Sequence, residues 1–65
     1  MLLRVKDYVM DPSGRVLERK DILINPSQVV MIEVVHNIYY KTTFASGSTI
    51  NLDGNDFTAV KNALS

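Results

Sequence analysis

The stretch from Asn25 to Leu52, NPSQVVMIEVVHNIYYKTTFASGSTINL, constrains the fold of this chain more than any other part of it. Apolar and β-branched runs alternate here with turn-forming residues, a pattern typical of consecutive antiparallel strands. Asn25-Pro26-Ser27 separates it from the preceding run, because proline lacks an N–H and restricts the residue before it. The stretch therefore predicts three antiparallel strands, which the rest of the chain continues or packs against.

The first turn within this stretch lies at His36-Asn37, between two apolar runs. Asparagine tolerates left-handed backbone geometry, so these residues predict a two-residue hairpin loop. That loop would pair Val35 with Ile38 and Met31 with Thr42.

The second turn lies at Ala45-Ser46-Gly47. A type I turn with a glycine bulge would pair Thr42 with Ile50 and Tyr40 with Leu52. A tighter two-residue turn would shift this pairing by one residue and move Ile50 and Leu52 to the opposite face. We favour the bulge because it gathers the large apolar groups on one face. That face would carry Val29, Met31, Val35, Ile38, Tyr40, Phe44, Ile50 and Leu52.

Residues 2–24 predict a further hairpin, with strands at 2–9 and 15–24. Its turn, Asp11-Pro12-Ser13-Gly14, has the residue order of a type I turn, and Gly14 is suited to positive φ. The charged run Glu18-Arg19-Lys20-Asp21 is typical of a solvated edge that discourages further strand pairing, rather than of a recognition strip. The expected apolar face of this hairpin consists of Leu3, Val5, Val9, Leu17 and Leu23.

A short helix is expected at the C-terminus. Asn55 or Asp53 is suited to be its N-cap, and Asp56 suits the positive end of the first turn. Apolar residues then recur at helical spacing at Phe57, Val60, Ala63 and Leu64. A helix of about nine residues is not stable alone, so it is expected to pack on the sheet.

The chain has 65 residues, which predicts one domain over 1–65. The expected class is α+β and mainly β: a five-stranded bent antiparallel sheet or a small open barrel, with one C-terminal helix. The chain has no cysteine and one histidine, which excludes disulfides and argues against cysteine- or histidine-rich metal sites. Oligomerisation therefore remains as the support that so small a core commonly needs.

No pattern in the sequence indicates catalysis or a cofactor. His36 is the only imidazole, and no serine, cysteine or aspartate is arranged beside it by a recognisable motif. Asp53-Gly54-Asn55-Asp56 lacks the spacing and distal glutamate of a calcium loop. We therefore predict no catalytic, cofactor-binding or metal-binding residues and a protein that is not an enzyme.

The charge balance and the hydropathy of the chain limit its expected cellular location and the classes of partner it is expected to bind. Seven Lys/Arg balance seven Asp/Glu, which argues against nucleic-acid binding. No apolar run approaches the roughly 18 residues of a membrane span, and the N-terminus lacks the apolar core of a signal peptide. A cytoplasmic protein that does not contact a membrane is expected.

The second face of the central hairpin is the candidate interaction surface. It would carry Val30, Ile32, Val34 and Tyr39, with Lys41 below them. One short helix cannot cover both sheet faces, so either the N-terminal hairpin curls over this face or another subunit covers it.

These features predict a non-enzymatic binding module that self-associates. It could be a bacterial or phage accessory protein that inhibits or sequesters a protein target. The alternative is a nucleic-acid-binding β domain that stacks bases on Tyr39 and Tyr40 and contacts phosphate through Lys41.

The segment Asn25-Pro26-Ser27-Gln28-Val29-Val30-Met31-Ile32-Glu33 resembles the N-P-[DS]-x-[IV]-x-x-I-E stretch of the small flagellar-operon family FlbD. Proteins of that family have about this length and continue, as here, with a strand ending in a glycine turn, an apolar strand and a short helix. The resemblance implies the fold and carries no site residue across. The chain departs from the family by its longer N-terminal hairpin and by the run from Val34 to Tyr40.

Overall fold

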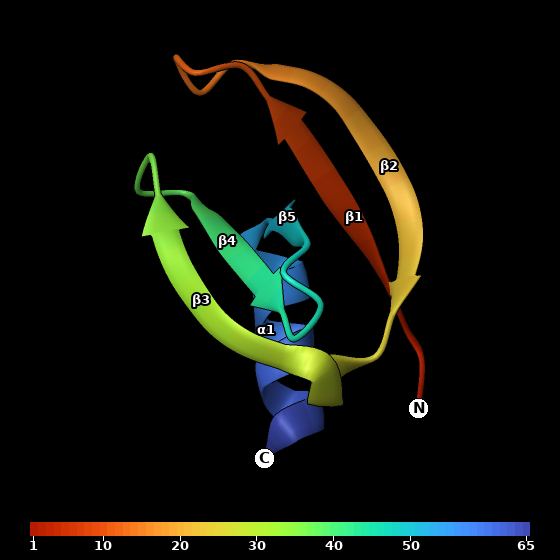
Figure 1. Cartoon of the computed structure of the whole chain (residues 1–65). Coiled ribbons are helices and arrows are strands. Elements are labelled where there is room, and N and C mark those ends of the chain that lie inside the picture. The colour runs from red at the N-terminus through yellow and green to blue at the C-terminus, as the bar shows by residue number, and fades with distance from the viewer.

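The computed structural model describes residues 1–65. It contains five strands, one α-helix and a short 3₁₀ helix, η1, as Figure 1 shows. The mainly β class with one C-terminal helix is confirmed. The elements, in order, are β1 (Leu3–Met10), β2 (Val16–Ile24), η1 (Pro26–Gln28), β3 (Val29–Val35), β4 (Tyr39–Phe44), β5 (Thr49–Leu52) and α1 (Gly54–Leu64).

The strands form two antiparallel sheets, β1-β2 and β3-β4-β5, so the expectation of a single five-stranded sheet or a small open barrel is wrong. β1 and β5 are neighbours, but side chains replace the ladder between them. The Asn51 N–H donates to the Asp7 carboxylate at 3.0 Å, and the Asn51 side-chain amide donates to the Tyr8 carbonyl at 3.0 Å. These three residues form what we call the seam between the sheets. Because a carboxylate accepts the Asn51 N–H, continuous backbone pairing is interrupted here.

The turn predicted at Asp11-Pro12-Ser13-Gly14 is confirmed. Gly14 has a φ of 91°, and its N–H donates to the Asp11 carbonyl at 3.0 Å. The Asp11 carboxylate accepts hydrogen bonds from the Ser13 hydroxyl and from the backbone N–H groups of Ser13 and Arg15. These hydrogen bonds hold the pKa of the Asp11 carboxyl below its usual value, and the bond from the Ser13 hydroxyl contributes most.

The apolar face predicted for the first hairpin places Leu3 opposite Leu23, but this register holds only beside the turn, where Met10 pairs with Val16. The pairing shifts between Val9 and Met10, so that Leu3 lies opposite Ile24. A one-residue shift exchanges the two faces of a strand. Leu17 and Leu23, expected on the apolar face, are therefore exposed.

The register of β3 against β4 is also shifted by one residue. His36 and Asn37 have the expected positive φ, 50° and 62°, but Ile38 belongs to the turn as well. Val35 consequently pairs with Tyr39 instead of Ile38. A further irregularity lies between Val29 and Met31.

These shifts change which side chains of the β3–β4 hairpin face the core. Met31 pairs with Thr43 instead of Thr42, and Ile32 takes the place opposite Thr42. Met31 and Ile38, both expected on the apolar face, are exposed.

The β4–β5 turn follows the glycine-bulge prediction. Gly47 has a φ of 92°, and its N–H donates to the Phe44 carbonyl at 2.8 Å. Thr42 pairs with Ile50, and Tyr40 pairs with Leu52, as expected. The alternative two-residue turn is excluded by this register.

The core is small and lies between the two sheets and α1. Only 7 of 65 residues are buried, so few side chains carry the packing energy. The buried hydrophobic residues are Val5, Ile24, Ile50, Leu52 and Val60. Thr42 is also fully buried, and its hydroxyl donates to the Tyr40 carbonyl at 3.3 Å.

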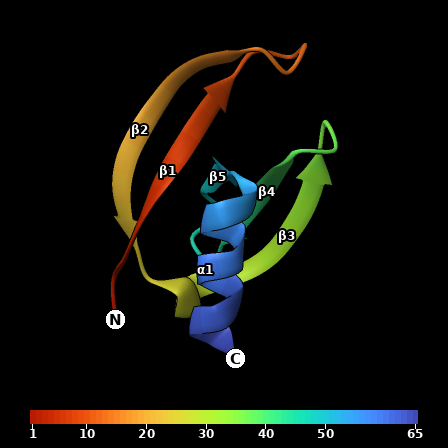
Figure 2. The ribbon, with the colours of Figure 1, turned by 180° about the vertical axis from the view of Figure 1, so that it is seen from behind.

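Helix α1 packs on β4, β5, β1 and η1, and Figure 2 shows it in front of β4 and β5. Asp53 is its N-cap, and the carboxylate accepts the Asp56 N–H at 2.8 Å. The Phe57 ring stacks on Tyr40, with ring centroids 4.1 Å apart. Val60 is buried as expected, whereas Leu64 at the helix end is exposed.

Candidate interaction surface

The unusual feature of this surface is its composition rather than its size. The accessible area is 4328 Å², close to the about 4,200 Å² that scaling gives for a monomer of this mass. Nine large hydrophobic side chains are nevertheless exposed. Four of them belong to β3 and the following turn: Val30, Met31, Val34 and Ile38.

Strand β3 lies at the edge of its sheet, with β4 on one side and no strand on the other (Figure 1). Glu33 is its only charged residue among seven. Strand β2, the edge of the other sheet, instead carries the charged run Glu18-Arg19-Lys20-Asp21. Charges on an edge strand oppose pairing with another chain, so β3 is the less protected edge.

Two of the five residues predicted to form the interaction surface are strongly exposed apolar side chains. Val30 is 65% exposed and Val34 is 62% exposed. Lys41 is exposed as well, whereas Ile32 and Tyr39 are half-buried.

The five residues do not share one face. Val34 pairs with Tyr40, and Ile32 pairs with Thr42, on the face toward α1. Lys41 pairs with Glu33 on the other face. The one-residue shift of the β3–β4 register separates these residues. It places each β3 side chain on the face opposite to the one predicted, relative to the side chains of β4.

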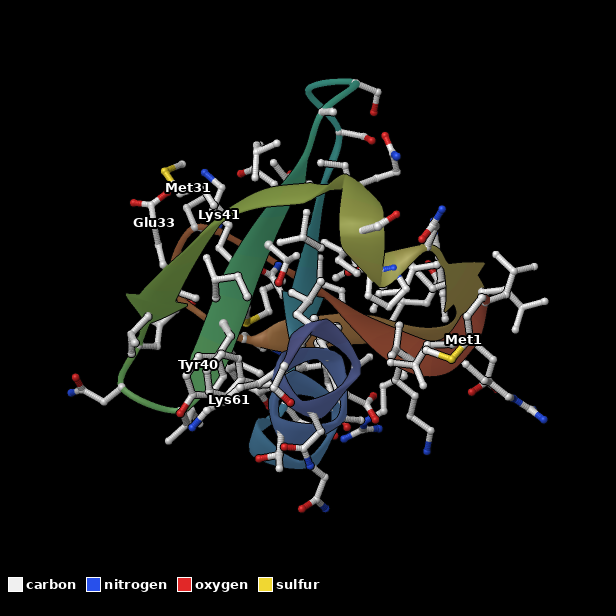
Figure 3. All side chains as sticks on the ribbon, turned by 90° about the horizontal axis from the view of Figure 1, so that it is seen from below. Met1, Met31, Glu33, Tyr40, Lys41 and Lys61 are labelled. Carbon is white, nitrogen blue, oxygen red and sulfur yellow. The ribbon has the colours of Figure 1, made fainter.

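Figure 3 displays the two faces in one view. Met31, Glu33 and Lys41 project together on the side away from α1. Tyr40 lies on the helix side, near Lys61. The candidate surface is therefore the edge of β3 with both of its flanks, and we call it the β3 edge: Val30, Met31, Ile32, Glu33 and Val34.

The N-terminal hairpin covers part of the face away from α1. The Tyr8 ring lies against Tyr39, with centroids 5.1 Å apart, and the Arg19 guanidinium lies 5.7 Å from the Tyr8 ring centroid. This contact explains why Tyr39 is half-buried. It does not extend to Val30 or Val34, which remain exposed.

The residues of the nucleic-acid alternative are separated by the fold. Tyr39 and Lys41 are on the face away from α1, whereas Tyr40 stacks on Phe57 with the two rings nearly parallel, at 3°. One side of the Tyr40 ring is thus occupied. Base stacking on adjacent tyrosines requires open ring faces on one surface, which this arrangement does not provide.

His36 belongs to the turn between β3 and β4, and its ring lies against Gly14 in the turn of the other hairpin. Figure 1 shows these two turns at the same end of the molecule. A Cβ on Gly14 would be only 2.8 Å from atoms of the His36 ring, so the imidazole packs directly on the glycine backbone. The contact joins the two sheets at the end opposite η1. No local pattern in the sequence indicates this contact, since the two residues belong to different hairpins.

Asp53 connects the cap of α1 to β1. Besides accepting the Asp56 N–H, its carboxylate accepts the Tyr8 hydroxyl at 2.7 Å. This hydrogen bond is the main cause that raises the pKa of Tyr8 above its usual value, and burial of the phenol adds to it. No group of three or more His, Cys, Asp or Glu side chains gathers in a geometry that could hold a metal ion.

Two open depressions flank the core. One of about 400 Å³ is mostly charged and lies at the start of α1, beside Lys6 and Asp56. The other, of about 360 Å³, is mainly apolar and lies between the end of β2 and the β4–β5 turn. Neither contains the β3 edge.

No protein-family model, curated protein or solved structure matches this chain. None of its helices has the length and apolar character needed to cross a membrane.

Proposed function

We propose that this protein is a non-enzymatic binding module that acts as a homo-oligomer. The observation that carries the proposal is the β3 edge, an unprotected strand edge with large apolar side chains in a chain with a very small core. An open strand edge is a template for pairing with another chain, and exposed apolar side chains on it favour that association.

Association would add the burial that one protomer lacks. Val30 and Val34 each expose nearly two thirds of their area, and covering one of them contributes roughly 1 kcal/mol. A gain of this size from several side chains is large beside the marginal stability of a 65-residue domain.

In the cell, the same module would serve as an accessory protein that inhibits or sequesters a protein target. The small size and the absence of a recognisable catalytic motif support this role. The resemblance of the segment 25–33 to the FlbD family is consistent with a bacterial or phage origin and a cytoplasmic location.

The test is the dependence of mass and thermal stability on protein concentration. Sedimentation over an about hundredfold concentration range should show a shift from monomer to oligomer, and Tm should rise with concentration because association stabilises only the folded state. A monomer of constant Tm throughout this range would contradict the proposal.

A further inference from the structure

We propose that the β3 edge pairs with the β3 edge of a second copy of this chain. The two strands would run antiparallel about a two-fold axis at Ile32 and join two three-stranded sheets into one of six strands. This inference rests on the proposed function and specifies its surface and its partner.

The choice of strand follows from which edges are open. β5 has β4 on one side and β1, through the seam, on the other. Only β2 and β3 therefore present an edge with no neighbouring strand. β2 carries four consecutive charged residues, whereas β3 carries only Glu33. Pairing through β3 desolvates the fewest charges.

The position of Glu33 selects the register. An axis at Ile32 places Val30 opposite Val34 of the second copy and Glu33 opposite Met31. An axis one residue later would place the two Glu33 carboxylates directly opposite each other, and like charges in that position are destabilising. The two-fold axis at Ile32 therefore matches apolar groups and separates the acidic ones.

The interface that this pairing would form is small. A standard interface takes about 800 Å² from each partner, roughly a fifth of the 4328 Å² of this protomer. A single strand edge with its flanking side chains is smaller, so we expect a dimer at the weak end of that range.

The first test compares two lysine substitutions at equal exposure. Val34 and Leu23 are both 62% exposed, but Val34 is on β3 and Leu23 is on β2. Val34→Lys should raise the dimer dissociation constant at least about tenfold, because each dimer would hold two charges at the paired edges. Leu23→Lys should leave it unchanged. Circular dichroism checks that both variants are folded.

The second test uses the absence of native cysteine. Ile32→Cys would place two thiols on the axis, where Cα atoms of opposed residues lie about 4.5–5.5 Å apart, within reach of a disulfide. Val34→Cys would place its two thiols four residues out of register, about 14 Å apart and too far to link. Mild oxidation should therefore cross-link the first variant and not the second.

A double variant covers the case in which the half-buried Ile32 does not tolerate substitution. Val30→Cys/Val34→Cys should form a linked dimer, whereas each single variant should not. Cross-linking of Val34→Cys alone, or of none of these variants, would overturn the inference.

The outcomes separate this inference from the proposed function. A monomeric wild type contradicts both. A wild-type dimer that Val34→Lys leaves intact contradicts only the pairing through β3. Dissociation by Leu23→Lys but not by Val34→Lys would assign the contact to β2 instead.

Discussion

Gly14 and Gly47 have nearly the same backbone conformation, with φ values of 91° and 92°, but very different surroundings. A Cβ on Gly14 would meet the His36 ring at 2.8 Å, whereas a Cβ on Gly47 would meet nothing within 4 Å. Gly47→Ala should therefore cost only the backbone strain, about 1–2 kcal/mol. Gly14→Ala should cost clearly more, because the imidazole must also move.

Urea unfolding measures the difference in cost between the two glycine substitutions. Gly14→Ala and Gly47→Ala are each made in the wild type and in the His36→Ala background, which gives four variants. In the background of His36→Ala, the excess cost of Gly14→Ala over Gly47→Ala should largely disappear, since the ring that the new methyl meets is gone. An equal cost of the two glycine substitutions in the wild-type background would show that the tip contact does not constrain the turns.

Tyr8 links stability to alkaline pH. Folding raises the pKa of its phenol, chiefly through the hydrogen bond to Asp53, so the folded state favours the neutral form. This contribution is complete below the unfolded pKa of about 10 and is lost as the pH rises through the folded value. Tyr8→Phe should cost about 1 kcal/mol at neutral pH and should flatten the alkaline decline.

Urea unfolding of wild type and variant from neutral to alkaline pH gives this comparison. Tyr40→Phe, which keeps the ring stack on Phe57 and leaves the Tyr8–Asp53 hydrogen bond in place, is the control and should keep the alkaline decline. If the free energy of unfolding of the wild type and of Tyr8→Phe declined in parallel with rising pH, Tyr8 would not be the source of the alkaline decline.

At the scale of elements, α1 depends on its first turn. Asp53 rather than Asn55 caps the helix, so Asp53→Ala should lower the free energy of unfolding by about 1–2 kcal/mol, with the lost Tyr8 bond adding to the loss. Asn55→Ala should be nearly neutral. Thermal unfolding compares the two, and equal effects would contradict the assignment of the cap.

Sequence reasoning located the elements well because their boundaries have strong local signals. Gly14 and Gly47 mark turns that need positive φ, and Pro26 ends the run before β3. The register of two hairpins was missed because it depends on a one-residue irregularity between Val9 and Met10 in one and on the inclusion of Ile38 in the turn of the other. No residue type marks these, and each reverses which side chains face the core.

At the scale of the whole molecule, the sequence indicated an excess of apolar surface but not its arrangement. Val30 and Val34, two of the residues predicted to form the interaction surface, are exposed in the protomer. Their grouping with Lys41 on one face was wrong, because the shifted register places Lys41 opposite Glu33. The division into two sheets could not be predicted either, since it depends on where the Asp7 carboxylate meets the Asn51 backbone N–H in space.

The seam has a consequence for how the molecule comes apart. An uninterrupted ladder would make all five strands open together, but β1 and β5 are joined by a few side-chain hydrogen bonds. We expect the hairpin of residues 3–24 to detach as a cooperative unit at a lower free energy than global unfolding, because this exposes Val5 and Ile24 of the core but leaves the β3-β4-β5 sheet paired. Such a detached arm could dock on the body of a neighbouring copy in place of that copy's own arm, the event known as domain swapping.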